Sequence, residues 1–290
     1  MASTRAGFIG LGNLGLPMAK KIVRKGIPLT VFDLRKELVD QMSALGAAAA
    51  TSAKEVAAKS DVIISMVNDV ADTDAVIFGQ DGVWDGINRD AIIVITSTLG
   101  PSYCQNLYGK AKERGVSVID APVSKNGPTN DGELTLMIGG DEDAVARCRP
   151  IFEALATHPF HLGGIGTGQT YKLINNLLSG ALVWATREAL DLGLKAGLDL
   201  EKMIEVMRVG TANNWNLSQL DYQIKSHKMG AAATAPKPTK NIASKDWNLG
   251  LELAEKVGAN LPMSRFTHEF DAKLAYDQFY AVMKSKGMNL

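Results

Sequence analysis

The chain has 290 residues, of which 46% are hydrophobic, and its 31 Lys and Arg residues balance 31 Asp and Glu residues. This composition excludes a disordered chain, and the lack of a basic excess argues against a general nucleic-acid-binding protein. The length predicts two domains, because single hydrophobic cores stop growing below about 300 residues.

The sequence carries no signal for disulfides, metals or membranes. Two cysteines, Cys104 and Cys148, cannot build a disulfide framework, so we expect buried thiols in a reducing compartment. No cluster of Cys and His has the spacing of a zinc site, and no apolar run reaches the roughly 18 residues of a membrane span. Only residues 1–4 precede a strand-like stretch at residues 5–9, which leaves no room for a signal or transit peptide. We therefore expect a soluble cytoplasmic protein.

Short apolar runs alternate with helix-length segments over the first 164 residues. The predicted strands span residues 7–9, 29–32, 62–66, 91–95 and 116–119, and the segments between them include predicted helices over 14–25 and 101–114. Apolar runs without alternation are typical of parallel strands buried on both faces. The pattern predicts an α/β fold, with a Rossmann-type doubly wound parallel sheet in an N-terminal domain of residues 1–164.

The first predicted strand leads directly into a G-x-G-x-x-G pattern that opens a helix. Its residues are Gly10, Leu11, Gly12, Asn13, Leu14 and Gly15. Gly10 allows a tight turn, Gly12 lets the backbone approach a pyrophosphate, and Gly15 permits close packing of helix on strand. The N–H groups at the start of the helix then face the phosphates. The pattern predicts a dinucleotide-binding site.

An acidic residue at the end of the second predicted strand selects the cofactor. Asp33 lies 18 residues beyond Gly15, where its carboxylate can bind the adenosine ribose hydroxyls. The same carboxylate would repel the 2′-phosphate of NADP, so we expect NAD. Arg35 argues in the other direction, because a nearby arginine can accommodate that phosphate.

After the glycine-rich stretch at residues 163–168, the pattern of alternating strands and helices gives way to helical segments alone. A long helical pattern runs over 169–195, and further helices are predicted over 200–209, 245–257 and 265–284, with no convincing strand. We expect residues 165–290 to form an all-α domain for substrate binding and oligomerisation, joined through the long interdomain helix. The apolar surface of that helix predicts a homodimer or homotetramer.

Four stretches together resemble one family in order and spacing. They are residues 7–19 (GFIGLGNLGLPMA), 120–124 (DAPVS), 168–176 (GQTYKLINN) and the pair Lys245-Asp246. The chain resembles the β-hydroxyacid dehydrogenases, which include 3-hydroxyisobutyrate dehydrogenase, tartronate semialdehyde reductase and sulfolactaldehyde reductase. The resemblance covers almost the whole chain. It implies an NAD(H)-dependent oxidoreductase acting on a small anionic β-hydroxy acid or the corresponding semialdehyde.

The resemblance also implies roles for individual residues. It makes Lys172 the catalytic residue, with Asn175 and Asn176 ordering the substrate and Ser124 binding the substrate carboxylate. Five further positions match residues that line the nicotinamide or close over the cofactor, namely Met66, Val67, Asn68, Thr98 and Lys245.

The spacing of Lys172, Asn175 and Asn176 suits that chemistry. Positions i, i+3 and i+4 share one side of a helix. Oxidation of an alcohol releases a hydride and a proton, and a lysine can take the proton if desolvation and positive neighbours lower its pKa. In the reverse direction the ammonium donates a proton to the carbonyl oxygen. The asparagine amides can donate hydrogen bonds to the same oxygen as charge develops.

Substrate recognition departs from the family pattern. The usual motif continues Ser-Gly-Gly, whose glycines let a carboxylate sit on backbone amides, whereas Ser124 is followed by Lys125 and Asn126. Lys125 is either a solvated side chain on a rearranged loop or a second cation for an extra or sulfonate anion. A segment with five lysines and no acid lies between Asp221 and Asp246, and is either a solvated loop or a positive flap over an anionic ligand. Its lysines are Lys225, Lys228, Lys237, Lys240 and Lys245.

Other functions remain open on the same scaffold. Imine or ketone reductases resembling this family typically replace the lysine at position 172. Decarboxylating 6-phosphogluconate dehydrogenases carry His where Asn175 stands, and they are longer. A catalytically idle NAD-binding interaction protein would lose the lysine as well. His158 and His161 fall in no matched motif, and we interpret them as structural.

Overall fold

The computed structural model describes residues 4–126, 133–220 and 240–269, although the side chains of Asn126 and of residues 240–244 are not described. Its contacts divide the chain into two units, Met1–Lys172 and Leu173–Leu290, and each unit is described by itself. The predicted boundary after residue 164 lies just before helix α8 (Thr167–Lys195), which runs from one unit into the other. The boundary therefore stays a prediction.

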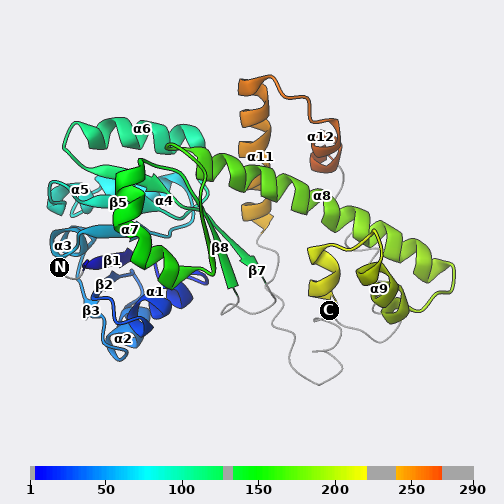
Figure 1. The fold of residues 1–290 in the computed structure, drawn as a ribbon, viewed down its shortest axis with the longest axis horizontal. Helices are drawn as coiled ribbons and strands as arrows, with labels where there is room; N and C mark the ends of the chain where they lie inside the picture. Colours follow the sequence, from blue (N-terminus) through cyan, green and yellow to red (C-terminus); the bar gives the residue numbers. More distant parts are fainter. Residues whose placement is uncertain (1–3, 127–132, 221–239, 270–290) are drawn as a thin grey trace. The chain divides into compact units, whose positions relative to one another are not determined.

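The first unit is built on a parallel sheet of six strands in the order β3-β2-β1-β4-β5-β6. The strands are β1 (Ala6–Ile9), β2 (Leu29–Phe32), β3 (Ala48–Ala49), β4 (Val62–Ser65), β5 (Ile92–Ile95) and β6 (Ser117–Asp120). Every neighbouring pair runs parallel. In Figure 1, the labels of β5, β1, β2 and β3 follow one another down the picture in this order. This is the strand order of a doubly wound dinucleotide-binding fold, so the predicted fold class is confirmed.

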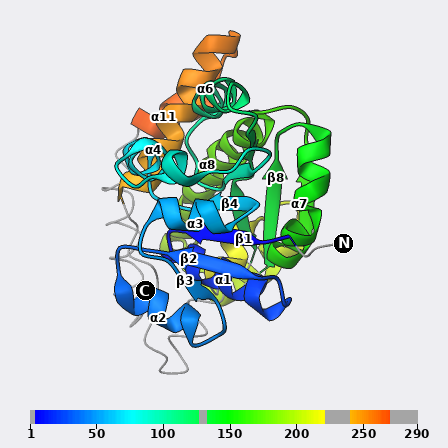
Figure 2. The same ribbon diagram turned by 90° about the vertical axis from the view of Figure 1, so that its left-hand side faces the viewer.

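Helices cover both faces of this sheet because its strands are apolar on both sides. They are α1 (Gly15–Arg24), α2 (Lys36–Ser43), α3 (Ala53–Lys59), α4 (Val70–Phe78), α5 (Val83–Gly86), α6 (Pro101–Lys112) and α7 (Glu142–Leu155). Phe8 of β1 is buried in a cluster with residues of α1, α2 and α7, whereas its neighbour Ile9 is buried with residues of α3, α4, α5 and α6. In the view of Figure 2, α3 and α4 lie above β1 and β2, and α1 and α2 lie below them. Cys104 and Cys148 are free thiols, one in each cluster.

A second, smaller sheet was not predicted. It contains β7 (Val123–Asn126), β8 (Glu133–Ile138) and β9 (His158–His161) in the order β7-β8-β9. The stretch from Ser124 to Asn126 was interpreted as a loop, and that interpretation is wrong, because β7 pairs with β8 in an antiparallel register. Strand β8 is absent from the predicted strands because its sequence, ELTLMI, mixes polar and apolar residues. In the structure its positions are accordingly exposed, half-buried or buried.

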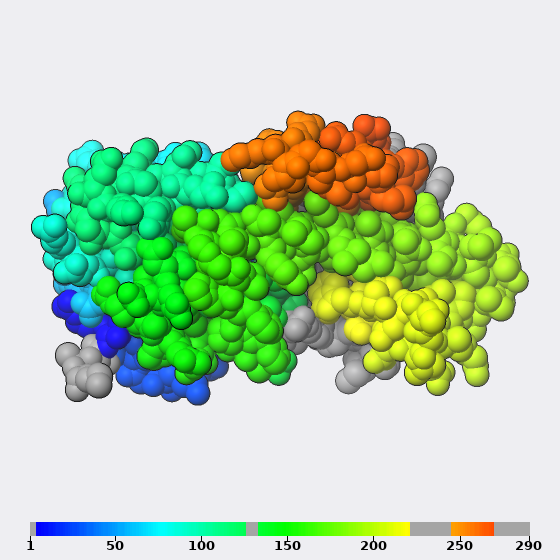
Figure 3. Space-filling view, turned by 45° about the horizontal axis from the view of Figure 1, so that its top comes forward, coloured from blue at the N-terminus to red at the C-terminus, as the bar shows by residue number. Residues whose placement is uncertain are grey.

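The described part of the second unit is helical, as predicted. Besides the main part of α8 it contains α9 (Leu200–Val209), α11 (Lys240–Val257) and α12 (Pro262–Glu269), and no strand lies among its described residues. The predicted last helix, over 265–284, continues outside the described residues. The indole N–H of Trp247 in α11 donates to the carbonyl of Ser264 in α12 at 2.9 Å, and Figure 3 shows the two helices side by side.

Two glycines let α8 and α11 approach each other closely. A methyl group on Gly180 would clash with the ring of Trp247, and one on Gly250 would lie 2.9 Å from the side chain of Leu177. In the described parts of the chain, no helix combines the length and apolar character that crossing a lipid bilayer requires.

Candidate functional site

The glycine-rich turn after β1 has the geometry that its sequence predicted. Gly10 has φ of +94°, which favours glycine, and a side chain there would clash with the carbonyl oxygen of Met66. A side chain on Gly15 would clash with the carbonyl of Gly10. Gly12 differs, because the only atom near its added methyl position is a guanidinium nitrogen of Arg35 at 3.9 Å. The turn is therefore tightly packed at its two ends and open at its centre.

The start of α1 suits an anionic ligand. No side chain caps this N-terminus, and its first turn contains no acidic residue. The first N–H groups of a helix and the positive end of its dipole attract anions, above all phosphates. Together with the open position at Gly12, this arrangement fits the pyrophosphate of a dinucleotide.

The carboxylate of Asp33, directly after β2, is held by four hydrogen bonds. Its Oδ2 accepts from the N–H of Leu11 at 2.6 Å and from Arg35 Nη2 at 3.1 Å. Its Oδ1 accepts from the N–H of Arg35 at 2.9 Å and from Arg35 Nε at 3.0 Å. Burial alone would raise the pKa of Asp33, but the hydrogen bonds from Arg35 and Leu11 outweigh it and lower the pKa. Asp33 is thus an ionised acceptor beside the glycine turn, with Arg35 already engaged on it.

Two further turns meet at the carboxyl edge of the sheet. The N–H of Met66, after β4, donates to the carbonyl of Ile9 at 2.9 Å. The hydroxyl of Ser97 donates to the carbonyl of Val67 at 2.7 Å and accepts from its N–H at 3.0 Å. The structure therefore brings the predicted stretch Met66 to Asn68 together with the turn that contains Thr98. Ser97, which links them, was given no role by sequence reasoning, although it immediately precedes Thr98.

Strand β7 places the three predicted substrate residues in register with β8. Ser124 lies opposite Thr135, Lys125 opposite Leu134 and Asn126 opposite Glu133. Successive residues of a strand point to opposite faces, so Ser124 and Lys125 point in opposite directions. Lys125 shares its face with the buried core residues Val123 and Leu134.

The first turn of α8 is anchored on the sheet by a buried acid and a buried amide. Asp120, the last residue of β6, accepts from the N–H of Gly166 and from the N–H of Gln169, both at 2.6 Å. Burial raises the pKa of Asp120 to about 6, and the backbone hydrogen bonds oppose that rise. The side chain of Gln169 binds the backbone of residues 97–100. Lys172 follows Gln169 by three residues on the same helix.

Asp120 and Gln169 lie within two of the motifs that carry the family resemblance, but the sequence assigns neither residue a role. The available signal was an acid at the end of a buried strand and an uncharged amide at the start of a helix. Neither pattern says which backbone groups the side chain meets.

In the second unit, three predicted residues join one chain of polar contacts. Asn175 Nδ2 donates to Asn176 Oδ1 at 3.2 Å, and Asn176 Nδ2 donates to Oδ2 of the buried Asp246 at 2.7 Å. Lys245 Nζ lies 3.8 Å from Asp246 Oδ1. The sequence assigns Asp246 no role beyond its place beside Lys245 in a motif. In the structure, Asp246 connects the amides of Asn175 and Asn176 to Lys245.

Other predicted features lie elsewhere. Asn68 is exposed, and its amide donates to Asp72 at 2.6 Å. The ring of His161 contacts the carbonyls of Gly140 and Gly163 at 2.9 and 3.0 Å. Of the lysine-rich segment, Lys225, Lys228 and Lys237 lie outside the described residues, as does the side chain of Lys240.

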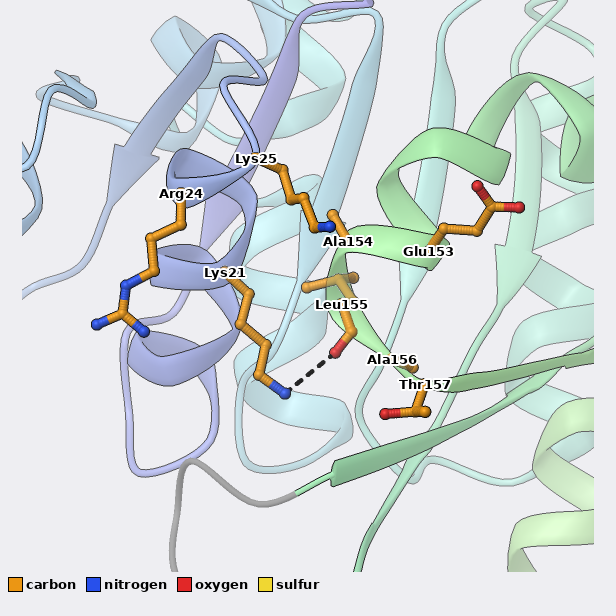
Figure 4. Close-up of a pocket in the computed structure, with 8 residues that line it drawn as sticks. All are labelled: Lys21, Arg24, Lys25, Glu153, Ala154, Leu155, Ala156 and Thr157. Atoms are coloured by element: carbon orange, nitrogen blue, oxygen red, sulfur yellow. Dashed lines mark hydrogen bonds between the residues drawn. The ribbon is translucent and has the colours of Figure 1, made fainter.

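A pocket of about 320 Å³ opens at the opposite end of α1, against the end of α7 (Figure 4). Lys21 Nζ donates to the carbonyl of Leu155 there at 3.4 Å. Its lining residues are Lys21, Arg24, Lys25, Glu153, Ala154, Leu155, Ala156 and Thr157. None of them is a predicted site residue. At about 1.5 Å of rise per residue, the lining residues of this end of α1 begin about 9 Å along the helix from Gly15 and reach about 15 Å at Lys25.

Comparison with known proteins finds family models that match most of the chain. Residues 5–164 match a family model described as the NAD-binding domain of 6-phosphogluconate dehydrogenase. Residues 166–279 match a model described as NAD-binding of NADP-dependent 3-hydroxyisobutyrate dehydrogenase.

The similarity to individual relatives extends over most of this chain and most of each relative. The chain is 34% identical to an NAD-dependent L-serine dehydrogenase from Pseudomonas aeruginosa, over 88% of this chain and 87% of that protein. It is 32% identical to a 3-hydroxyisobutyrate dehydrogenase from the same species, over 90% and 88%. A solved structure of Mycobacterium tuberculosis 3-hydroxyisobutyrate dehydrogenase with L-serine has a TM-score of 0.80 and 27% identity, covering 99% of this chain and 100% of that one.

Proposed function

The chain belongs to the β-hydroxyacid dehydrogenase family and uses NAD, and we propose that it oxidises a small 3-hydroxy acid or reduces the matching semialdehyde. Candidate substrates are 3-hydroxyisobutyrate and L-serine, the compounds named for its relatives. One observation carries the proposal. Lys172 is followed on the same side of α8 by Asn175 and Asn176, and the amide of Asn176 is held by the buried Asp246.

The first unit provides the features needed to hold the cofactor. The backbone of residues 10–15 and the N-terminus of α1 would bind the pyrophosphate, and Asp33 would bind the adenosine ribose. The turns at Met66 to Asn68 and at Thr98 would line the nicotinamide side. Bound NAD supplies the hydride acceptor for oxidation, and its reduced form supplies the hydride donor.

The side chains of α8 would handle the proton. In oxidation, Lys172 takes the hydroxyl proton as the general base, and in reduction its ammonium returns a proton to the carbonyl oxygen. The Asn175 and Asn176 amides donate hydrogen bonds to the same oxygen as charge develops on it. The contact between Asn176 and Asp246 fixes the orientation of that amide. Lys245, beside Asp246, would close over the cofactor and substrate.

Ser124 is the proposed ligand of the substrate carboxylate, with Asn126 one step further along that side of β7. A sulfonated or doubly anionic substrate is the second candidate, and Lys125 in place of the family's glycine is the observation that favours it. The register of β7 argues for the simpler substrate, because Lys125 points away from Ser124 and toward the face of Leu134. A single anion cannot easily bind both side chains.

The absorbance of NADH at 340 nm tests the activity. Purified protein is assayed with NAD and NADP against 3-hydroxyisobutyrate, L-serine, glycerate, 3-hydroxypropionate, threonate and 2,3-dihydroxypropanesulfonate. We expect turnover of a monocarboxylate with NAD, and a loss of about 10²- to 10⁴-fold in kcat for Lys172→Ala, the usual share of a general base. Lys195→Ala is the matched control, because Lys195 lies on the same helix and pairs with Asp191.

Each outcome has a distinct meaning. Tight NADH binding without turnover on any acid would indicate the idle interaction protein. Full activity of Lys172→Ala would show that another group moves the proton. A preference for the sulfonate that disappears in Lys125→Met would establish the second candidate.

We also infer that the protein is a homodimer or homotetramer in the cytoplasm. The support is the apolar surface of α8, where Ile174, Leu178 and Leu192 are exposed. Light scattering coupled to gel filtration measures the assembly, and a monomer at micromolar concentration would contradict it.

A further inference from the structure

The helix that carries Lys172 begins on a fully buried carboxylate. Both oxygens of Asp120 accept backbone N–H groups from the start of α8, those of Gly166 and Gln169. The first N–H groups of a helix have no partner within the helix, and a capping side chain usually comes from the residue just before it. Here the cap comes from the end of β6, 46 residues before Gly166. The start of α8 is thereby tied to one point on the sheet.

A second side chain ties the same turn to the neighbouring loop. Gln169 Oε1 accepts from the N–H groups of Leu99 and Gly100 at 2.9 and 3.1 Å, and Gln169 Nε2 donates to the carbonyl of Ser97 at 2.8 Å. These three contacts surround Thr98, a proposed nicotinamide contact. Gln169 is also fully buried. The first turn of α8 is therefore fixed relative to the loop residues on both sides of Thr98.

The packing around Asp120 leaves little room for adjustment. A methyl group on Gly139 would lie 2.5 Å from Asp120 Oδ1, and one on Gly168 would lie 2.8 Å from Asp120 Oδ2. Gly139 brings the backbone just after β8 directly against the carboxylate, and Gly168 does the same for the backbone of α8. A shift of the helix along its axis or about it would break the short hydrogen bonds rather than stretch them.

We propose that Asp120 and Gln169 are positioning residues, which set the height and rotation of α8 so that Lys172 meets the reacting atoms beside Thr98. The inference rests on the proposed function. Gln169 and Lys172 are i and i+3, so they lie one turn apart on one side of the helix. Burying a carboxylate is costly, and an apolar contact would hold a helix on a sheet as well. Hydrogen bonds to a polar anchor instead have a preferred length and angle, so they fix the position of the helix more narrowly than an apolar contact does.

Isosteric and longer variants test the proposal. Asp120→Asn keeps the shape of the side chain but loses an acceptor, Asp120→Glu moves the carboxylate by one methylene, and Gln169→Met removes the three contacts to residues 97–100. We expect kcat to fall about 10- to 100-fold in each, since a misplacement of about 1 Å costs on that order. In the two Asp120 variants the dissociation constant for NADH should stay within twofold, because the glycine turn, Asp33 and the contacts around Thr98 are untouched.

The pH profile separates positioning from simple loss of structure. Misplacing Lys172 changes its surroundings, so the limb of kcat/KM against pH that reports Lys172 should move in the variants. A merely structural defect lowers activity without moving that limb. Asp199→Ala is the control, because Asp199 caps α9 through the N–H of Lys202 at 2.9 Å and serves no proposed site residue. It should lose stability and keep both kcat and the pH profile.

The outcomes are decisive. Variants that bind NADH and keep kcat within twofold would overturn the proposal. If no variant folds, the proposal also fails, because Asp120 and Gln169 would then be needed for folding and not for positioning. If the wild-type protein turns over no acid, the proposed function fails, and hydrogen exchange still tests the anchor. Exchange of the amides of residues 166–172 should then rise at least tenfold in Asp120→Asn, with α9 unchanged. Unchanged exchange would overturn the anchor itself.

Discussion

Asp33 and Asp120 both lie at carboxyl ends of strands in one parallel sheet, yet their surroundings move the carboxyl pKa in opposite directions. Asp33 receives a bidentate guanidinium from Arg35, which outweighs burial and lowers its pKa. Asp120 receives only neutral backbone donors, so burial dominates and raises its pKa to about 6. The same residue type at similar positions is thus set for different tasks by its partners.

The raised pKa of Asp120 predicts an unusual pH dependence of stability. Between the unfolded value of 3.8 and about 6, the folded state holds a proton that the unfolded state has released. The contribution of Asp120 to the free energy of unfolding therefore falls as pH rises through this window, by roughly 3 kcal/mol in all. We expect the free energy of unfolding of wild type, relative to Asp120→Asn, to decrease from pH 4 to pH 7 in urea titrations. The opposite slope would show that the hydrogen bonds from Gly166 and Gln169 outweigh burial.

Arg35 predicts a competition for Asp33. Its guanidinium occupies acceptor sites on Asp33 that the ribose hydroxyls of NAD would need under the proposed function. Because the Arg35 side chain is about half exposed, we take the pair to be worth about 0.2–1 kcal/mol. In Arg35→Gln we expect the KM for NAD to fall by about 1.5- to 5-fold and turnover with NADP to decrease. Lys36→Gln is the control, because Lys36 pairs with Asp40 instead. A rise in the KM for NAD would show that Arg35 helps to bind it.

Helix α3 shows how a short element is defined by its ends. Ser52 caps it by accepting from the N–H of Glu55 at 3.2 Å, and Glu55 in turn accepts from the N–H and the hydroxyl of Thr51. Hydrogen bonds from Lys59 and then from Thr51 lower the pKa of Glu55 to about 2. The helix places Val56 in the core, so local capping and tertiary burial support the same seven residues.

Removing this cap should cost stability without touching chemistry. We expect Ser52→Ala to lower the free energy of unfolding by about 1 kcal/mol. Ser43→Ala is the matched control, because the Ser43 hydroxyl only donates back to the carbonyl of Val39 within α2. Thermal and urea unfolding measure both variants, and equal losses would contradict a capping role. Turnover per folded molecule should be unchanged in each.

At the scale of the whole molecule, the proposed cofactor site links cofactor binding to the folding of the first unit through the glycine turn. The turn has two kinds of glycine. Gly10 is required by its backbone conformation, whereas Gly12 borders open space and has an ordinary φ. A ligand that binds only the folded state stabilises it by mass action, by about 2.7 kcal/mol at 100 times its dissociation constant.

This difference predicts separable effects of two substitutions. Gly12→Ala should unfold at the wild-type temperature without cofactor but lose most of the stabilisation by NADH, because its methyl group would occupy the place proposed for the pyrophosphate. Gly10→Ala should be destabilised even without cofactor. Gly109→Ala, in an open position on α6, is the control and should respond fully to NADH. Full stabilisation of Gly12→Ala by NADH would contradict this placement of the cofactor.

The sequence by itself determined the features that follow local rules. Apolar runs such as residues 92–95 indicate buried strands, the glycine pattern requires a tight turn, and α9 begins and ends where its pattern predicted. Tertiary structure alone decided the face on which Lys125 lies, the anchoring of α8 by Asp120, and the link from Asn176 to Asp246, which joins residues 70 apart. The physical reason is that a strand's register and the partner of a buried polar group depend on which backbone and side chains arrive from elsewhere in the chain, and no local pattern specifies them.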